Sequence, residues 1–121
     1  MRRQILSVTT NGTGDGTTTG AAVLGKLFAI EYRPGTLDTD AVVTITCESD
    51  TSKALLTLTS PGTSDLWRYP RDLVHAVADG AALTGTAGGD RAMPVLNGAL
   101  KVLVAAGGDT LTGSVVIYYI E

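Results

Sequence analysis

The chain has 121 residues, a hydrophobic fraction of 44% and a formal net charge of −3 at pH 7. This length suits a single domain with one core, and the hydrophobic fraction is too high for global disorder. Charged residues make up only 17%, so Thr, Ser, Gly and Asn must cover much of the surface. The nine basic residues are scattered, which disfavours nonspecific nucleic-acid binding. We therefore expect one domain over residues 1–121 and no nucleic-acid partner.

The cysteine content and the N-terminus give no indication of secretion. Cys47 is the only cysteine, so an internal disulfide is impossible, and it alternates with Val43 and Ile45 like a small buried hydrophobe. Arg2 and Arg3 precede an apolar run that is too short for a signal peptide. No stretch approaches the roughly twenty apolar residues of a membrane span. We expect a protein that stays soluble in a cytoplasm until it assembles, with no membrane partner.

Strand patterns recur along the chain, separated by Gly, Pro, Asp and Asn. In chain order the expected strands are 4–10, 26–33, 41–48, 54–59, 99–105 and 115–120. In the second strand Phe28, Ile30 and Tyr32 share one face, and Pro34-Gly35 marks the turn that follows. The strands 41–48 and 54–59 are expected to pair as a hairpin.

The segments between these strands suggest loops and short extended pieces. Residues 1–4 could form an N-terminal arm, and residues 11–20 and 81–89 read as flexible polar loops. Residues 67–71 should be extended, because Pro70 disfavours helix before it. Residues 72–77 fit either a helical turn or a strand. With no long helix-period segment, seven or eight short strands predict an all-β fold, an antiparallel β-sandwich or jelly roll.

The last expected strand is apolar on both faces. Val115, Ile117 and Tyr119 lie on one face, and Val116, Tyr118 and Ile120 lie on the other. Such a strand is either covered on its outer face by the chain's own loops or packed against another subunit.

Residues that could carry chemistry are few. The Gly-rich segment 11–16 could approach an anion or calcium, but neither a P-loop Lys-Ser/Thr nor a set of carboxylates accompanies it. His75 is the only histidine, and no nucleophile elbow is present for it to serve. The main concentration of acidic residues is two separated pairs, Asp38 with Asp40 and Glu48 with Asp50. We expect no catalytic residue, no cofactor and no metal site.

The segment Trp67-Arg68-Tyr69-Pro70-Arg71 is the most distinctive in the chain. Trp, Tyr and Arg dominate interface hot spots, and exposed aromatics can also bind sugars or single-stranded nucleic acid. Core packing, a subunit interface and a ligand platform are the three interpretations. The residues expected to form an interface are Arg2, Arg3, Trp67, Arg68, Tyr69, Arg71 and Tyr118.

Three stretches resemble small virion proteins of tailed bacteriophages and prophages. They are LFAIEYRPGTLD at 27–38, WRYPR at 67–71, and the ending from LKV at 100–102 through Gly108 to VIYY at 116–119. Together they cover roughly half the chain. The resemblance implies a structural role in the particle, with no catalytic or cofactor residues.

The expected function is therefore that of a capsid decoration, or cement, protein that binds major capsid proteins or other virion proteins. It would be assembled in the host bacterial cytoplasm and located in the virion, as a homo-oligomer with a trimer as the expected form. A neck, tail or baseplate component is the alternative within the same class. A carbohydrate-binding β-sandwich module is the alternative from another class, and an enzyme is not expected.

Overall fold

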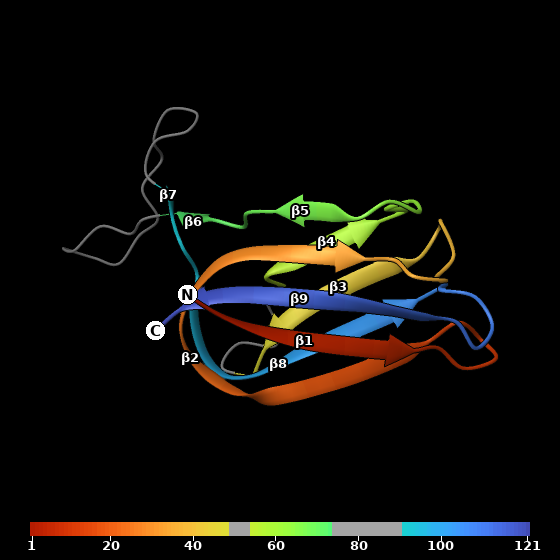
Figure 1. Cartoon of the computed structure of the whole chain (residues 1–121), viewed down its shortest axis with the longest axis horizontal. Helices are drawn as coiled ribbons and strands as arrows, with labels where there is room; N and C mark the ends of the chain where they lie inside the picture. The colour runs from red at the N-terminus through yellow and green to blue at the C-terminus, as the bar shows by residue number, and fades with distance from the viewer. Residues whose placement is uncertain (49–53, 74–90) are drawn as a thin grey trace.

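A computed structural model describes residues 1–48, 54–73 and 91–121 of the chain (Figure 1). Over these ranges the chain forms strands and turns and contains no helix, hence none long and apolar enough to cross a bilayer. The predicted all-β class is confirmed.

Nine strands are assigned within the described residues. They are β1 (Arg2–Thr9), β2 (Gly16–Arg33), β3 (Val42–Cys47), β4 (Leu56–Thr59), β5 (Leu66–Arg68), β6 (Asp72–Leu73), β7 (Arg91–Ala92), β8 (Val95–Ala105) and β9 (Thr112–Ile120). Seven of them form one antiparallel sheet in the order β1-β9-β2-β8-β3-β4, with β5 paired to β2. Strands β6 and β7 form a separate two-stranded ribbon.

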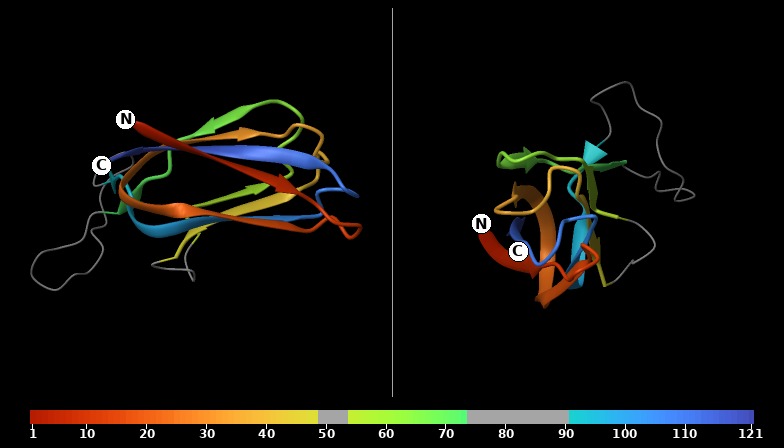
Figure 2. Two further views of the ribbon diagram at one scale, coloured as in Figure 1. Left: turned by 60° about the horizontal axis from the view of Figure 1, so that its bottom comes forward. Right: turned by 90° about the vertical axis from the view of Figure 1, so that its right-hand side faces the viewer.

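The long strand β2 connects the two halves of this sheet. Its first part pairs with β8 as far as Lys26, which lies opposite Val95, and from Lys26 onwards it pairs with β9, where Ile120 lies opposite. The sheet therefore curls along β2 into two facing layers, β1-β9-β2-β5 and β2-β8-β3-β4 (Figure 2). The sandwich or jelly-roll arrangement is not confirmed, because the strands form one continuous curled sheet.

The core lies between the two layers. Period-two alternation gives the correct inward faces for β3 and β8, where Val43, Ile45, Leu100 and Val102 are completely buried. The predicted hairpin of strands 41–48 and 54–59 is confirmed as β3 and β4. Cys47 is also buried on the core side of β3.

Two loop predictions are wrong. The expected N-terminal arm belongs to β1, because Arg2, Arg3 and Gln4 pair with Tyr119, Tyr118 and Ile117 on β9. The expected flexible loop 11–20 shrinks to a turn, because β2 already begins at Gly16 and pairs with β8. The expected loop 81–89 lies outside the described residues, as do His75 and most of 72–77.

One end of the molecule is built from tight turns that are bonded to one another. The buried Thr10 hydroxyl donates to the Gly108 carbonyl at 2.6 Å and accepts from the Leu111 amide at 2.9 Å. The Thr36 hydroxyl accepts from the Thr112 amide at 2.9 Å. Both chain termini lie at the opposite end (Figure 1). The molecule thus has a turn end and a terminal end.

Candidate interaction surface

The outer face of the β1-β9-β2-β5 layer carries the most distinctive group of exposed side chains. Cross-strand partners point to the same side of a sheet, so the pairing fixes which side chains share this face. One row contains Trp67, Glu31, Val116 and Ile5 from four adjacent strands. The next row contains Ala29, Tyr118 and Arg3.

Trp67 and Tyr118 form a stacked ring pair on this face. Their ring centroids are 5.1 Å apart and their planes differ by 27°. Because β2 separates β5 from β9, this contact crosses the outer side of β2. Val116 and Ala29 face outward beneath the aromatic residues and are nevertheless completely buried, outside the main core cluster. The outer face of β9 is therefore covered at Val116, whereas Tyr118 is partly exposed and Ile120 is exposed.

A β-bulge adds Phe28 to the same face. Leu27 lies opposite Tyr119 and Ala29 lies opposite Tyr118, so Phe28 is the extra residue on β2. The expectation that Phe28 shares a face with Ile30 and Tyr32 is wrong, because the bulge shifts the alternation: Ile30 and Tyr32 are in the core.

Phe28 is held on the outer face by two residues that follow β5. The Tyr69 ring meets it edge-on, with centroids 6.1 Å apart and planes at 88°. The Arg71 guanidinium lies 5.8 Å from the Phe28 ring centroid and donates to the Phe28 carbonyl at 2.9 Å. We call Phe28, Trp67, Tyr69 and Tyr118 the aromatic surface.

A buried carboxylate lies beside the aromatic surface. Glu31 is only 7% exposed, and one of its oxygens accepts two hydrogen bonds from Arg33, at 2.9 and 3.1 Å. The Tyr118 hydroxyl lies 3.5 Å from the same oxygen. The hydrogen bond to Glu31, with a smaller contribution from its charge, raises the pKa of the Arg33 guanidinium. Arg33 therefore holds the Glu31 carboxylate in place next to the stacked rings of Trp67 and Tyr118.

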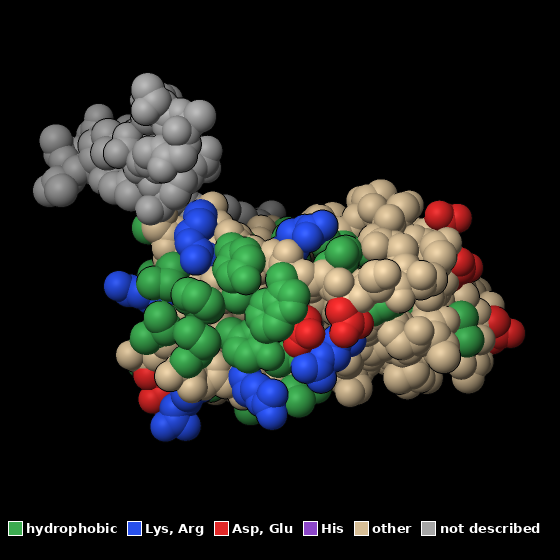
Figure 3. Space-filling view, turned by 45° about the horizontal axis from the view of Figure 1, so that its top comes forward, with side chains coloured by type: hydrophobic (Ala, Val, Ile, Leu, Met, Phe, Trp, Pro, Cys, Tyr) green, Lys and Arg blue, Asp and Glu red, His purple; other side chains and the backbone are tan. Residues whose placement is uncertain are grey.

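Basic side chains surround the aromatic surface (Figure 3). Arg3 lies beside Tyr118 in the pairing register, Arg68 follows Trp67 on β5, and Arg71 contacts Phe28. Within the described ranges, salt bridges join only Arg2 to Glu121 and Arg33 to Glu31. The charges of Arg3, Arg68 and Arg71 are therefore not neutralised by a carboxylate in that part of the chain.

Apolar surface continues from the aromatic residues around the terminal end. Trp67 and Tyr69 are 44% and 56% exposed, and Leu24 and Val95 are 69% and 67% exposed. A hollow of about 620 Å³ joins Phe28 and Arg71 to Val95, and one of about 290 Å³ joins Val95 to Leu24. Contiguous exposed apolar surface is uncommon on monomeric proteins, so this region is a candidate contact surface.

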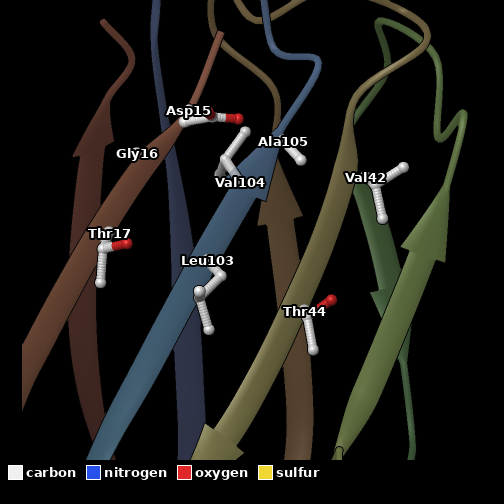
Figure 4. Close-up of a pocket in the computed structure, with 8 residues that line it drawn as sticks. All are labelled: Asp15, Gly16, Thr17, Val42, Thr44, Leu103, Val104 and Ala105. Atoms are coloured by element: carbon white, nitrogen blue, oxygen red, sulfur yellow. The ribbon is translucent and has the colours of Figure 1, made fainter. Parts of the chain in front are cut away.

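The outer face of the other layer has a different character. One row across four strands contains Thr17, Leu103, Thr44 and Thr57. A hollow of about 370 Å³ opens there over β2, β8 and β3 (Figure 4). Its lining consists of Asp15, Gly16, Thr17, Val42, Thr44, Leu103, Val104 and Ala105. Hydroxyl and aliphatic groups prevail there, and Asp15 is the only ionisable residue in the lining.

The turn at residues 11–16 satisfies its own polar groups. The side-chain oxygen of Asn11 accepts from the Thr13 amide at 2.9 Å, the Thr13 hydroxyl at 2.7 Å and the Asp15 amide at 3.1 Å. In the described part of the chain, no three His, Cys, Asp or Glu residues are grouped to hold a metal ion. The Asn11 oxygen thus holds the turn together through three hydrogen bonds.

The structure brings together five of the seven residues expected at an interface. Arg3, Trp67, Tyr69, Arg71 and Tyr118 contribute to one surface, with Arg68 at its β5 edge. Arg2 instead pairs with Glu121 at the terminal end. Three residues at or beside this surface were not predicted from the sequence: Phe28, Glu31 and Arg33.

Comparison with known proteins finds no match: no family model, curated protein or solved structure is significantly similar to the chain.

Proposed function

We propose that the chain is a structural protein of a tailed-bacteriophage virion, a capsid decoration protein that binds the major capsid protein through the aromatic surface. The observation that carries this proposal is a group of aromatic side chains on the sheet, with Trp67 and Tyr69 exposed, surrounded by Arg side chains that have no carboxylate partner within the described ranges. Trp, Tyr and Arg are the residue types that contribute most to protein–protein affinity. The resemblance of 27–38 and 67–71 to small virion proteins supports the same role.

The aromatic surface is well suited to repeated docking. Trp67 is stacked on Tyr118, and Phe28 is held by Tyr69 and Arg71, so the rings are ordered before a partner arrives. Ordered side chains lose little conformational entropy on binding. In a symmetric shell, modest contacts made by many copies stabilise the assembly collectively.

Copy number in purified particles tests this role directly. In particles of a phage whose genome encodes the chain, quantitative mass spectrometry should find on the order of hundreds of copies per particle, as symmetric decoration of a shell requires. About a dozen copies or fewer would favour the neck, tail or baseplate alternative. Absence of the chain from the particles would overturn the proposal.

Two further measurements test the oligomeric state and the carbohydrate-binding alternative. The mass of the purified chain in solution tests the expected trimer. Glycan binding that disappears in a folded Trp67→Ala variant would favour the carbohydrate-binding alternative, for which exposed Trp67 and Tyr69 are the relevant side chains.

A further inference from the structure

We infer, on the basis of the proposed function, that the docking site on the shell is an acidic and partly apolar protein patch. The chain binds this patch with its aromatic surface and terminal end, while the turn end points away from it. This deepens the proposed function by giving the partner's surface a chemistry and the bound chain an orientation.

Acidic and basic side chains are unevenly distributed along the long axis of the molecule. The turns at residues 10–15, 34–41 and 106–111 contain no Lys or Arg. Their acidic residues are all exposed: Asp15, Asp38, Asp40 and Asp109. Arg3 and Arg71 lie at the aromatic surface, and Arg68, which is opposite the buried Ile30 in the register, is exposed at its β5 edge. A partner with negative potential would attract one end of the chain and repel the other.

Large exposed apolar side chains are concentrated on the same part of the molecule as the basic side chains. Seven are Met1, Ile5, Leu24, Trp67, Tyr69, Val95 and Ile120, and they belong to the aromatic face or the terminal end. Leu103 is the only other one recorded for the described residues, and it lies in the Thr-rich row of the opposite layer. The apolar and basic side chains thus coincide on one region. A partner that satisfies both must combine apolar groups with carboxylates.

The basic side chains are available to a partner. Arg3 and Arg68 are exposed. Among the described residues, Arg68 donates to the adjacent Trp67 carbonyl at 2.9 Å, and Arg71 donates to the Phe28 and Pro70 carbonyls. These acceptors are neutral, and no salt bridge within the described ranges involves the three Arg side chains. Carboxylates of a partner would therefore gain charge-assisted hydrogen bonds with them.

The test is rebinding of the purified chain to particles of the same phage grown without its gene. Arg3→Glu and Arg68→Glu should each weaken binding about fivefold or more, because they put like charges against the partner. Lys101→Glu is the matched control, since it changes the net charge equally but lies in the Thr-rich layer opposite Thr19 and Thr46. It should change the dissociation constant by about twofold or less. Wild-type binding should also weaken as salt is raised from about 50 to 300 mM.

The outcomes distinguish the inference from the proposed function. If the wild-type chain does not rebind, the proposed function fails. If it rebinds while both Arg variants behave like Lys101→Glu, the function stands and the acidic docking patch is wrong. Weakened binding of an Asp38→Lys variant with unaffected Arg variants would reverse the orientation and overturn the inference. Binding to vesicles of anionic lipid in place of particles would overturn both.

Discussion

The indole of Trp67 on β5 stacks on the ring of Tyr118 on β9, with β2 lying between the two strands. This contact links β5 and β9 across the outer side of β2. It also explains why Ala29 and Val116 are buried on a face that is otherwise directed to solvent. The same two rings thus stabilise the fold and present the candidate docking surface.

Replacing Trp67 should reveal its structural contribution. Trp67→Ala removes a half-buried ring and an aromatic pair, so the free energy of unfolding should fall by about 2 kcal/mol. Denaturant titration followed by circular dichroism measures this change, since Trp67 is the only tryptophan and its fluorescence is lost. A double-mutant cycle with Tyr118→Ala should give a coupling energy of about 0.5–1.5 kcal/mol.

Leu24→Ala is the control for this experiment, because Leu24 is 69% exposed and lies outside the aromatic surface. It should change the free energy of unfolding by no more than about 0.5 kcal/mol. Equal effects of the Trp67 and Leu24 variants would mean that the ring pair adds nothing to stability.

The two partners of the Glu31–Arg33 pair should differ in their sensitivity to mutation. Arg33→Ala leaves a nearly buried carboxylate with the Tyr118 hydroxyl 3.5 Å away, so it should clearly lower the free energy of unfolding. Glu31→Gln leaves a guanidinium whose side chain is 41% exposed and can be hydrated, so it should lower the free energy of unfolding less than Arg33→Ala does.

The double variant Glu31→Gln/Arg33→Ala checks this reason. It should be more stable than Arg33→Ala alone, because no carboxylate is then left without its partner. A double variant less stable than either single variant would show that the buried charge is not the cause. Thermal unfolding at one pH and one salt concentration is sufficient for the comparison.

Local patterning accounts for much of the fold but little of the surface. Alternation of Val43, Ile45 and Cys47 predicts the inward face of β3, because β3 pairs with β8 from Val42 to Cys47 without a register shift. The bulge at Phe28 interrupts this relation, and nothing in the alternation of Phe28, Ile30 and Tyr32 indicates it. The side chains that form the aromatic surface therefore could not all be assigned from sequence.

The extent of β2 could not be predicted for a related reason. Residues 16–20 are Gly and Thr, a composition typical of loops, and they become a strand because they pair with β8, where Thr18 lies opposite Val102. The Thr18 hydroxyl also donates to the Ser7 carbonyl at 2.7 Å, and Gln4 donates to the Ala21 carbonyl. These partners are distant in sequence, so the pairing is a tertiary property.

The hydroxyl of Tyr32 should be a source of instability. Tyr32 is 1% exposed, and its hydroxyl has no hydrogen-bond partner among the described residues. A buried polar group without a partner costs about 1–3 kcal/mol, so Tyr32→Phe should raise the free energy of unfolding by about 1 kcal/mol. Tyr118→Phe, which removes a hydroxyl near Glu31, should not produce this gain.

Alkaline pH should enlarge the difference between wild type and Tyr32→Phe. Burial raises the pKa of Tyr32 above its ordinary value of 10.0, so the unfolded chain loses this proton at a lower pH than the folded chain. As pH rises above that value, ionisation stabilises only the unfolded state, and the free energy of unfolding of the wild type falls. Parallel titration of both proteins from neutral to alkaline pH should show curves that diverge; parallel curves would contradict the assignment.

The turn after β2 offers a test of close backbone packing. Gly35 has a φ of +55°, and a Cβ added there would collide with the Thr112 carbonyl oxygen, which accepts from the Thr36 amide at 2.9 Å. Gly62 has a φ of +86°, but an added Cβ would meet nothing within 4 Å. Gly62→Ala should therefore lower the free energy of unfolding by about 1 kcal/mol, which is the cost of placing a residue with a Cβ at a positive φ.

Gly35→Ala should cost that amount plus the displacement of Thr112, about 2–3 kcal/mol in all. Because β9 begins at Thr112, the displacement should also expose the first amides of β9, and hydrogen exchange would detect it there before the rest of the strand. If both glycine variants lose the same stability and exchange alike, the turn does not hold the start of β9, and the turn end is less rigid than its hydrogen bonds indicate.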